Sequence, residues 1–253
     1  MIKTTTLPAW YTGWPLMPGA HERNTSLEWY HSDSPAQYET IKKGERADWW
    51  ANTTPISYQF NSWGYRSPYN YTRNLFESSV VLIGCSQTLG VGLPWAWTVG
   101  ERLSEMINKP VINLGVAASS PKFAWAQNVR LAQWVEPLAV VNLWSGSART
   151  CDWTRDGVEH LGPWTDLDRK QHYKTWIANA TAVDMDVNLM VSSVDLLWAG
   201  RCASLALTPF NDTHTSTLVD YVAAPDAARD GGHWGPVTAR LLAEYLAEAL
   251  ATT

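Results

Sequence analysis

The chain has 253 residues, enough for one sizeable α/β core but too few for two domains of ordinary size. Its 19 Lys and Arg stand against 24 Asp and Glu, and no basic run could neutralise successive phosphates, so we expect no nucleic-acid partner. The three widely separated cysteines, Cys85, Cys151 and Cys202, fit neither a zinc site nor a disulfide framework, and we expect free thiols.

Neither a signal peptide nor a membrane span is predicted. The N-terminal segment has no uninterrupted apolar core, and nowhere do 18 apolar residues run together. We therefore expect a soluble, cytoplasmic protein that does not bind membranes.

Tryptophan is unusually abundant, with 16 residues against only four phenylalanines. Core packing accounts for most large aromatic side chains. Some of these indoles are nevertheless expected at the surface, where a flat ring can stack on sugars or other flat ligands.

Residues 1–75 are rich in Trp, Tyr, Pro, Ser and Asn and show neither a helical nor an alternating pattern. This composition predicts an irregular N-terminal extension packed on one α/β domain, formed by residues 76–253.

The regular part of the chain alternates apolar runs with helix-like segments. Runs at 80–85, 110–116, 138–145 and 203–210 predict buried strands, and helices are expected over 94–108, 121–136, 168–182 and 185–201, with a polar stretch at 146–167. The closing segment predicts an amphipathic helix whose apolar face holds Val237, Leu241, Leu242, Tyr245, Leu246 and Leu250.

Short apolar strands that alternate with helices indicate parallel strands joined by right-handed crossovers. The predicted fold is therefore a three-layer α/β/α sandwich with a central parallel sheet. Ligands of such sheets bind at the carboxyl ends of the strands. Residues at the ends of the first three runs should converge there, namely Ser86, Ala117-Ala118 and Ser145-Gly146.

Ser86 is a candidate nucleophile. A serine hydroxyl reacts only when a base takes its proton, and the base works best when a carboxylate fixes its tautomer. Asp230 and His233 stand three residues apart, just before the last helix. In a turn, this spacing lets the carboxylate reach Nδ1 of the imidazole while Nε2 points toward a nucleophile.

Each signal also has an ordinary structural interpretation. A Gly-x-Ser sequence is common in strand-to-helix turns, and His233 could simply cap the helix that follows it. Their occurrence together, at opposite ends of an α/β pattern, favours catalysis. The elbow of the α/β-hydrolase fold is excluded, because it needs glycine where Thr88 stands.

The segment "GCSQTLG", Gly84 to Gly90, resembles the first block of the SGNH, or GDSL, hydrolase family, Gly-Asp-Ser-x-Thr-x-Gly, with Cys85 in place of the aspartate. Asp230-Gly231-Gly232-His233 is similar to the family's last block, and "FNSWGYRSP" at 60–68 is similar to a stretch that precedes the first block in many members. The resemblance spans about 60–250.

This resemblance implies the SGNH hydrolase fold, which is flavodoxin-like, and a serine esterase that needs no metal or organic cofactor. By position, Ser86 is the nucleophile, His233 the general base and Asp230 its orienting partner. The oxyanion would be bound by the N–H of Ser86 and by a second N–H that aligns with Ala118, although Gly115 lies close by.

The family's third oxyanion donor, an asparagine side chain, is absent. Gly146-Ser147-Ala148-Arg149 stands in its place, so either Ser145, Ser147 or Arg149 substitutes or the activity is weak. Arg149 is also a candidate substrate contact. Trp234 either packs beside the substrate or belongs to the core.

The leading hypothesis is a serine esterase that acts on a small-molecule or carbohydrate ester, and the tryptophan excess favours O-acylated carbohydrate over long-chain lipid. The alternative is a non-hydrolytic module that keeps the fold and binds glycan or has a structural role. His160 and His172 have no second ligand at helical spacing and are interpreted as solvated surface residues rather than metal ligands.

Overall fold

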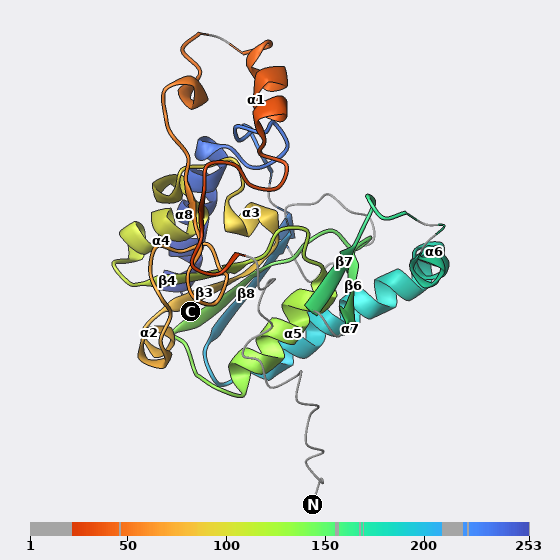
Figure 1. Ribbon diagram of the computed structural model, residues 1–253. Helices are drawn as coiled ribbons and strands as arrows, with labels where there is room; N and C mark the ends of the chain where they lie inside the picture. The colour runs from red at the N-terminus through yellow and green to blue at the C-terminus, as the bar shows by residue number, and fades with distance from the viewer. Residues whose placement is uncertain are drawn as a thin grey trace, which may run out of the picture.

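The computed structural model describes residues 22–45, 47–154, 157–166, 168, 170–208, 220–221 and 223–252. A five-stranded parallel sheet in the order β4-β3-β5-β8-β9 forms its centre (Figure 1). The strands are β3 (Val80–Gly84), β4 (Val111–Gly115), β5 (Ala139–Leu143), β8 (Ala203–Thr208) and β9 (Asp220–Tyr221). Four of these match the apolar runs, so the predicted parallel sheet is confirmed.

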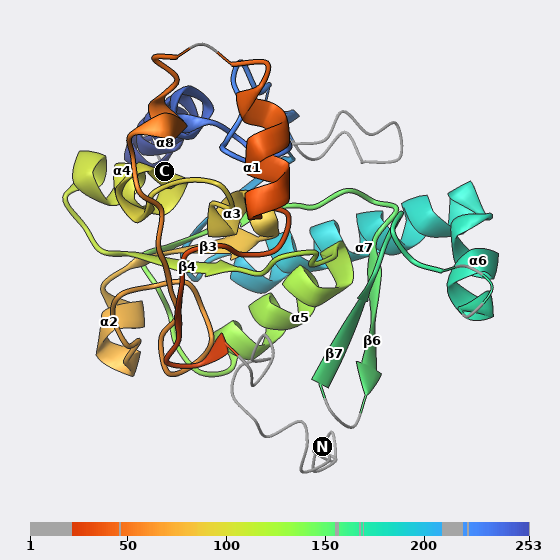
Figure 2. The same cartoon turned by 45° about the horizontal axis from the view of Figure 1, so that its top comes forward.

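Two pairs of helices cover the two faces of the sheet (Figure 2). Helices α4 (Val99–Ile107) and α8 (Pro236–Ala251) pack on one face, and α5 (Pro121–Ala132) and α7 (Ala180–Trp198) pack on the other. Successive strand side chains alternate between the faces: Val80 and Leu82 belong to the α4/α8 core, whereas Val81 and Ile83 belong to the α5/α7 core. The three-layer α/β/α fold is confirmed.

Helix boundaries depart from the sequence prediction where side chains cap the backbone. The expected helix over 94–108 is split into a 3₁₀ turn, Trp95–Trp97, and α4, because the hydroxyl of Thr98 accepts the N–H of Glu101. The expected break at 183–184 lies instead between α6 (Gln171–Ile177) and α7, where Asn179 caps α7.

The sequence analysis assigned no helix or strand within the polar stretch at 146–167, but the structure has regular elements there. This stretch contains an antiparallel hairpin of β6 (Thr150–Thr154) and β7 (Gly157–Leu161). The hairpin packs against α5, and the side chain of Lys122 on that helix donates to the carbonyl of Cys151. The side chains of β6 alternate between polar and apolar, and Cys151 and Trp153 pack in or against the α5/α7 core.

The apolar face predicted for the last helix is only partly correct. Leu242 and Leu246 are buried, but Val237, Leu241 and Tyr245 are nearly half exposed. The buried face of α8 instead includes small residues, Thr238, Ala239 and Ala243. Their small size allows α8 to approach α4 closely. The contact face of α8 therefore contains smaller side chains than the hydrophobicity pattern predicts.

The described part of the N-terminal region carries short elements: β1 (Ser26–Leu27), α1 (Pro35–Lys42), a 3₁₀ turn (Trp50–Asn52), β2 (Tyr58–Gln59) and α2 (Arg73–Glu77). Strands β1 and β2 form a separate two-stranded sheet. Within this region, Arg66 is buried and donates to the carbonyls of Leu89, Gly90, Leu93 and Ser57. Arg66 therefore holds the loop that follows Ser86 in place.

All three cysteines are free thiols, with Cys85 and Cys151 buried, as expected. Among the helices that the structure describes, none combines the length and the apolar character that a bilayer crossing would need.

Candidate active site

Ser86 lies at the carboxyl end of β3, as the first residue of the short helix α3 (Ser86–Leu89). The turn is too tight for a side chain at Gly84, where an added Cβ would come within 2.0 Å of Thr88 Oγ1. Gly90 ends α3 in the left-handed region, with φ of 80°. The two glycines thus permit the sharp turn that presents Ser86, whose residual exposure is 5%.

Asp230 and His233 are in contact in the loop before α8. His233 Nδ1 lies 2.6 Å from Asp230 Oδ2, and Oδ1 of the same carboxylate accepts the backbone N–H groups of Gly232 and His233. This is the orientation expected for a carboxylate that fixes an imidazole tautomer and leaves Nε2 for a nucleophile.

The Asp230 carboxylate remains ionised well below neutral pH. Burial alone raises its pKa, but the hydrogen bond and charge of His233, together with hydrogen bonds from Ser32 and the Gly232 N–H, outweigh burial and lower the pKa of Asp230 to about 2. A permanently charged Asp230 can stabilise an imidazolium on His233.

The loops that carry Ser86 and His233 touch through the residues that follow each of them. The N–H of Trp234 donates to Gln87 Oε1 at 2.8 Å, and the N–H of Arg229 donates to the carbonyl of Gly92 at 3.1 Å. The structure therefore brings the two loops to the same edge of the sheet. No direct hydrogen bond joins Ser86 to His233 in the described residues, and such bonds are commonly long before a substrate binds.

A short hairpin from the N-terminal region reaches the same loop, and no sequence motif marks it. Tyr30 and Asp33 pair through two backbone hydrogen bonds, which puts His31 and Ser32 at the tip. Ser32 Oγ donates to Asp230 Oδ2 at 2.7 Å. His31 has a φ of 59°, a strained conformation for a residue with a side chain.

His31 faces the candidate triad closely enough for their charges to interact. Burial lowers the pKa of His31, and a positive charge on His233 or Arg149 lowers it further, against the opposing effect of Asp230. His31 and Arg149 thus belong to the surroundings of His233.

A buried ion pair anchors the hairpin to the Asp230 loop. Arg229 Nε and an Arg229 terminal nitrogen lie 2.8 and 2.6 Å from the two oxygens of Asp33, and both side chains are almost fully buried. Tyr58 also donates to Asp33 and accepts the N–H of Gly92, in the loop that follows α3. One polar network therefore links the hairpin, the Asp230 loop and the Ser86 loop.

Ala118 and Gly115, the two candidates for the second oxyanion donor, differ in their N–H groups. Gly115 N–H donates to Asn113 Oδ1 at 2.8 Å and is already engaged. Ala118 occupies the turn between Val116 and Ser119 with a φ of 60°, and within the described residues its N–H has no hydrogen-bond partner. The geometry favours Ala118, and its left-handed φ explains why glycine would suit this position.

Ser145 follows β5 at the same offset as Ser86 follows β3, because Leu143 pairs with Gly84. The hydroxyl of Ser145 is buried and has no partner within the described residues. Ser147 is fully buried and, unlike the Ser145 hydroxyl, already takes part in an interaction. The guanidinium of Arg149 lies 5.2 Å from the ring centre of Trp164.

Trp234 lies in the core, one of the two positions that the sequence left open for it, whereas His160 departs from its expected surface position. The Trp234 side chain is 2% exposed and belongs to the α4/α8 core, so packing, not substrate contact, describes it. The solvated surface role of His160 is wrong: the ring packs edge-on against Phe123 with centroids 5.0 Å apart, and burial lowers the pKa of His160 to about 4.

Trp164 was missed by the sequence analysis and is 52% exposed. Its only local signal is an isolated tryptophan among polar residues. The contact with Arg149 places this indole beside the group of charged side chains that includes His31.

No protein-family model and no curated protein matches the chain. Among solved structures, the chain is similar to a lipolytic protein of the G-D-S-L family from Desulfitobacterium hafniense, with 14% identity over 68% of this chain and 98% of the other and a TM-score of 0.35. It is also similar to a lipase/acylhydrolase from Enterococcus faecalis, with 14% identity over 69% and 96% of the two chains and a TM-score of 0.41.

A third similar structure is a carbohydrate esterase family 2 enzyme with a carbohydrate binding domain from Myceliophthora fergusii. The identity is 13%, the match covers 74% of this chain and 68% of the other, and the TM-score is 0.42. These three similar structures are thus a lipolytic protein of the G-D-S-L family, a lipase/acylhydrolase and a carbohydrate esterase.

Proposed function

We propose that the protein is a serine hydrolase of the SGNH type that cleaves carboxylic esters through an acyl-enzyme on Ser86. The observation that carries this proposal is the 2.6 Å contact between His233 Nδ1 and Asp230 Oδ2, in a loop hydrogen-bonded to the residue after Ser86. A base fixed in one tautomer beside a serine turn is the arrangement that nucleophilic catalysis requires.

In the first half-reaction, Ser86 Oγ attacks the ester carbonyl carbon and its proton passes to His233 Nε2. The carbonyl π electrons move onto the oxygen, which the N–H groups of Ser86 and Ala118 stabilise. As the first residue of α3, Ser86 has no intrahelical acceptor for its own N–H. Collapse of the intermediate breaks the ester C–O bond, and the leaving alkoxide takes the proton from His233.

In the second half-reaction, water replaces the alcohol. His233 takes a proton from the water, the resulting hydroxide attacks the acyl carbon, and the bond to Ser86 Oγ breaks as Oγ recovers the proton from His233. The products are a carboxylic acid and free enzyme. The third oxyanion contact is assigned to Ser145, whose buried hydroxyl has no partner within the described residues.

The substrate class proposed is O-acylated carbohydrate. Trp164 offers an exposed ring, with Arg149 against it, on the side of the site where His31 lies. An exposed indole with a neighbouring guanidinium suits a ligand that has both an apolar face and hydroxyl groups.

The test is hydrolysis of p-nitrophenyl acetate and of acetylated xylan by wild type and Ser86→Ala, together with labelling by an organophosphonate. We expect turnover and labelling of wild type only. Equal rates in the two proteins would refute the proposal. Glycan binding without labelling of Ser86 would instead support the second candidate, a non-hydrolytic module. The observation that favours this candidate is the absence of the asparagine that serves as third oxyanion donor in the SGNH family.

A further inference from the structure

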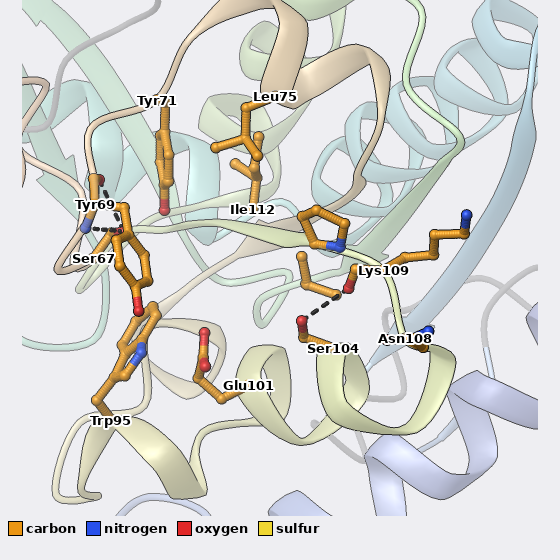
Figure 3. Close-up of a pocket in the computed structure, with 12 residues that line it drawn as sticks. Ser67, Tyr69, Tyr71, Leu75, Trp95, Glu101, Ser104, Asn108, Lys109 and Ile112 are labelled. Atoms are coloured by element: carbon orange, nitrogen blue, oxygen red, sulfur yellow. Dashed lines mark hydrogen bonds between the residues drawn. The ribbon is translucent and has the colours of Figure 1, made fainter.

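A cavity lies away from Ser86, beside the edge strand β4 (Figure 3). Its volume is about 590 Å³, within the range of small-molecule sites. Val111 and Ile112 at the start of β4 line it, whereas Ser86 lies beyond the carboxyl end of β3. Five strand residues separate the two ends of the sheet, a distance of roughly 16 Å at 3.3 Å per residue.

One side of the cavity is aromatic. Tyr69 and Trp95 stand together in Figure 3, with Tyr71 above them. Tyr69 is 65% exposed, but its backbone is fixed by three hydrogen bonds. Ser67 Oγ accepts the N–H of Tyr69 and donates to its carbonyl, and the side chain of Asn61 donates to the same carbonyl. A ring exposed on a fixed backbone loses little conformational entropy when a ligand stacks on it.

Polar side chains from α4 and the residues after it also line the cavity. Glu101 extends from α4 into the space, and Ser104 and Asn108 follow on the same side (Figure 3). The Glu101 carboxylate accepts a hydrogen bond from the indole of Trp95. Burial, the larger cause, and repulsion from Glu105 together raise the pKa of Glu101. A partly desolvated carboxylate beside an aromatic ring is a strong acceptor for a ligand hydroxyl.

Trp95 also borders a smaller cavity of about 220 Å³, lined by Pro55, Ser57, Gln59, Arg66, Pro68 and Pro94. The indole of Trp95 therefore borders both cavities. Together the two cavities offer a ligand a longer surface than one sugar ring would cover. The two terminal nitrogens of Arg66 donate to backbone carbonyls, and its Nε is buried without a partner in the described residues.

We propose that the cavity around Tyr69, Trp95 and Glu101 binds a neutral saccharide chain, at a site separate from Ser86. A pyranose has an apolar face of C–H groups and a rim of hydroxyls, which matches aromatic rings that stand beside a carboxylate, a hydroxyl and an amide. A methylated ammonium group would also suit aromatic rings and a carboxylate. It would fill only a small part of 590 Å³ and would leave Ser104 and Asn108 unused.

The test is isothermal titration calorimetry of the full chain with cellohexaose, xylohexaose and chitohexaose, and with tetramethylammonium as the competing ligand class. At least one oligosaccharide should bind wild type. Tyr69→Ala and Trp95→Ala should each weaken it about tenfold or more, which corresponds to about 1.4 kcal/mol. Glu101→Gln, which keeps one acceptor oxygen, should weaken it less than Glu101→Ala.

Tyr245→Ala, a substitution of another half-exposed tyrosine on α8, is the matched control and should bind as wild type does. Ser86→Ala should also bind normally, so a failure of the esterase proposal would leave this result unchanged. The inference is overturned if none of the three oligosaccharides binds, if Tyr69→Ala and Trp95→Ala retain full affinity, or if only tetramethylammonium binds.

Discussion

Ser32 Oγ and His233 Nδ1 contact the same oxygen of Asp230, at 2.7 and 2.6 Å. The carboxylate thus has an orienting partner from a segment 198 residues away in the chain. Gln37 on α1 adds a hydrogen bond to the carbonyl of Asp230. The loop that presents His233 is therefore fixed from outside the α/β sheet.

Removing the Ser32 hydroxyl should slow catalysis without weakening substrate binding. We expect Ser32→Ala to lower kcat for p-nitrophenyl acetate about tenfold at unchanged KM, because Asp230 loses a charge-assisted hydrogen bond worth roughly 1.5 kcal/mol. Ser32→Thr should restore most of the rate. Ser26→Ala, at an exposed serine of the same region, is the control; an unchanged kcat in Ser32→Ala would exclude a positioning role for Ser32.

Asp230 should make the protein more sensitive to acid. Its native pKa of about 2 lies below the unfolded value near 3.9, so its contribution to stability is nearly complete above about pH 5 and is lost as pH falls to about 1. The free energy of unfolding of wild type should fall roughly 2.6 kcal/mol further than that of Asp230→Asn over this window. Urea unfolding at a series of pH values measures both curves; parallel curves would contradict the low native pKa.

Several features of this molecule can be predicted from local sequence. The strands β3, β4 and β5 are continuous apolar runs because both faces of the sheet are covered. Ser86 is found from the glycines around it, and Asp230 with His233 from their spacing before a helix. Each of these signals lies within a few consecutive residues.

The His31-Ser32 hairpin could not be predicted, because its partners are distant in the chain. Asp33 meets Arg229 across 196 residues, and neither residue has a neighbouring pattern that indicates the pair. The α8 face was misassigned for a related reason: the approach of α4 favours Ala239 and Ala243 at the contact over the larger Leu241. Tertiary packing decided both cases.

Breaking the Asp33–Arg229 pair should cost much more than removing a surface ion pair. Asp33→Asn leaves the Arg229 charge buried beside Trp29, and we expect a loss of about 3–5 kcal/mol in the free energy of unfolding. Arg73→Gln, in an exposed pair with Glu77, should cost below about 0.5 kcal/mol. Chemical denaturation of both variants checks the contrast, and similar losses would contradict the buried geometry.

Glycine at position 118 should stabilise the turn. Ala118 has a φ of 60°, and an alanine in the left-handed region costs about 1 kcal/mol relative to glycine. We expect Ala118→Gly to raise the free energy of unfolding by about 0.5–1 kcal/mol and to retain esterase activity, since the backbone N–H stays in place. Ala117→Gly, with no positive φ at that position, is the control and should destabilise. A destabilised Ala118→Gly variant would show that the turn is unstrained.

Ser145 and Ser147 can be distinguished as replacements for the missing asparagine. The Ser145 hydroxyl is buried without a partner in the described residues, so nothing within them is lost when it is removed. We expect Ser145→Ala to keep wild-type stability and to lower kcat about 10²-fold, the typical cost of one oxyanion donor. Ser147 is engaged within the protein, so Ser147→Ala should reduce stability more than it reduces kcat in the folded fraction. Thermal unfolding measures the loss of stability, and active-site titration with an organophosphonate gives kcat of the folded fraction. A wild-type kcat in Ser145→Ala would show that Ser145 is not the third oxyanion donor. Arg149→Met would then be the next variant to assay.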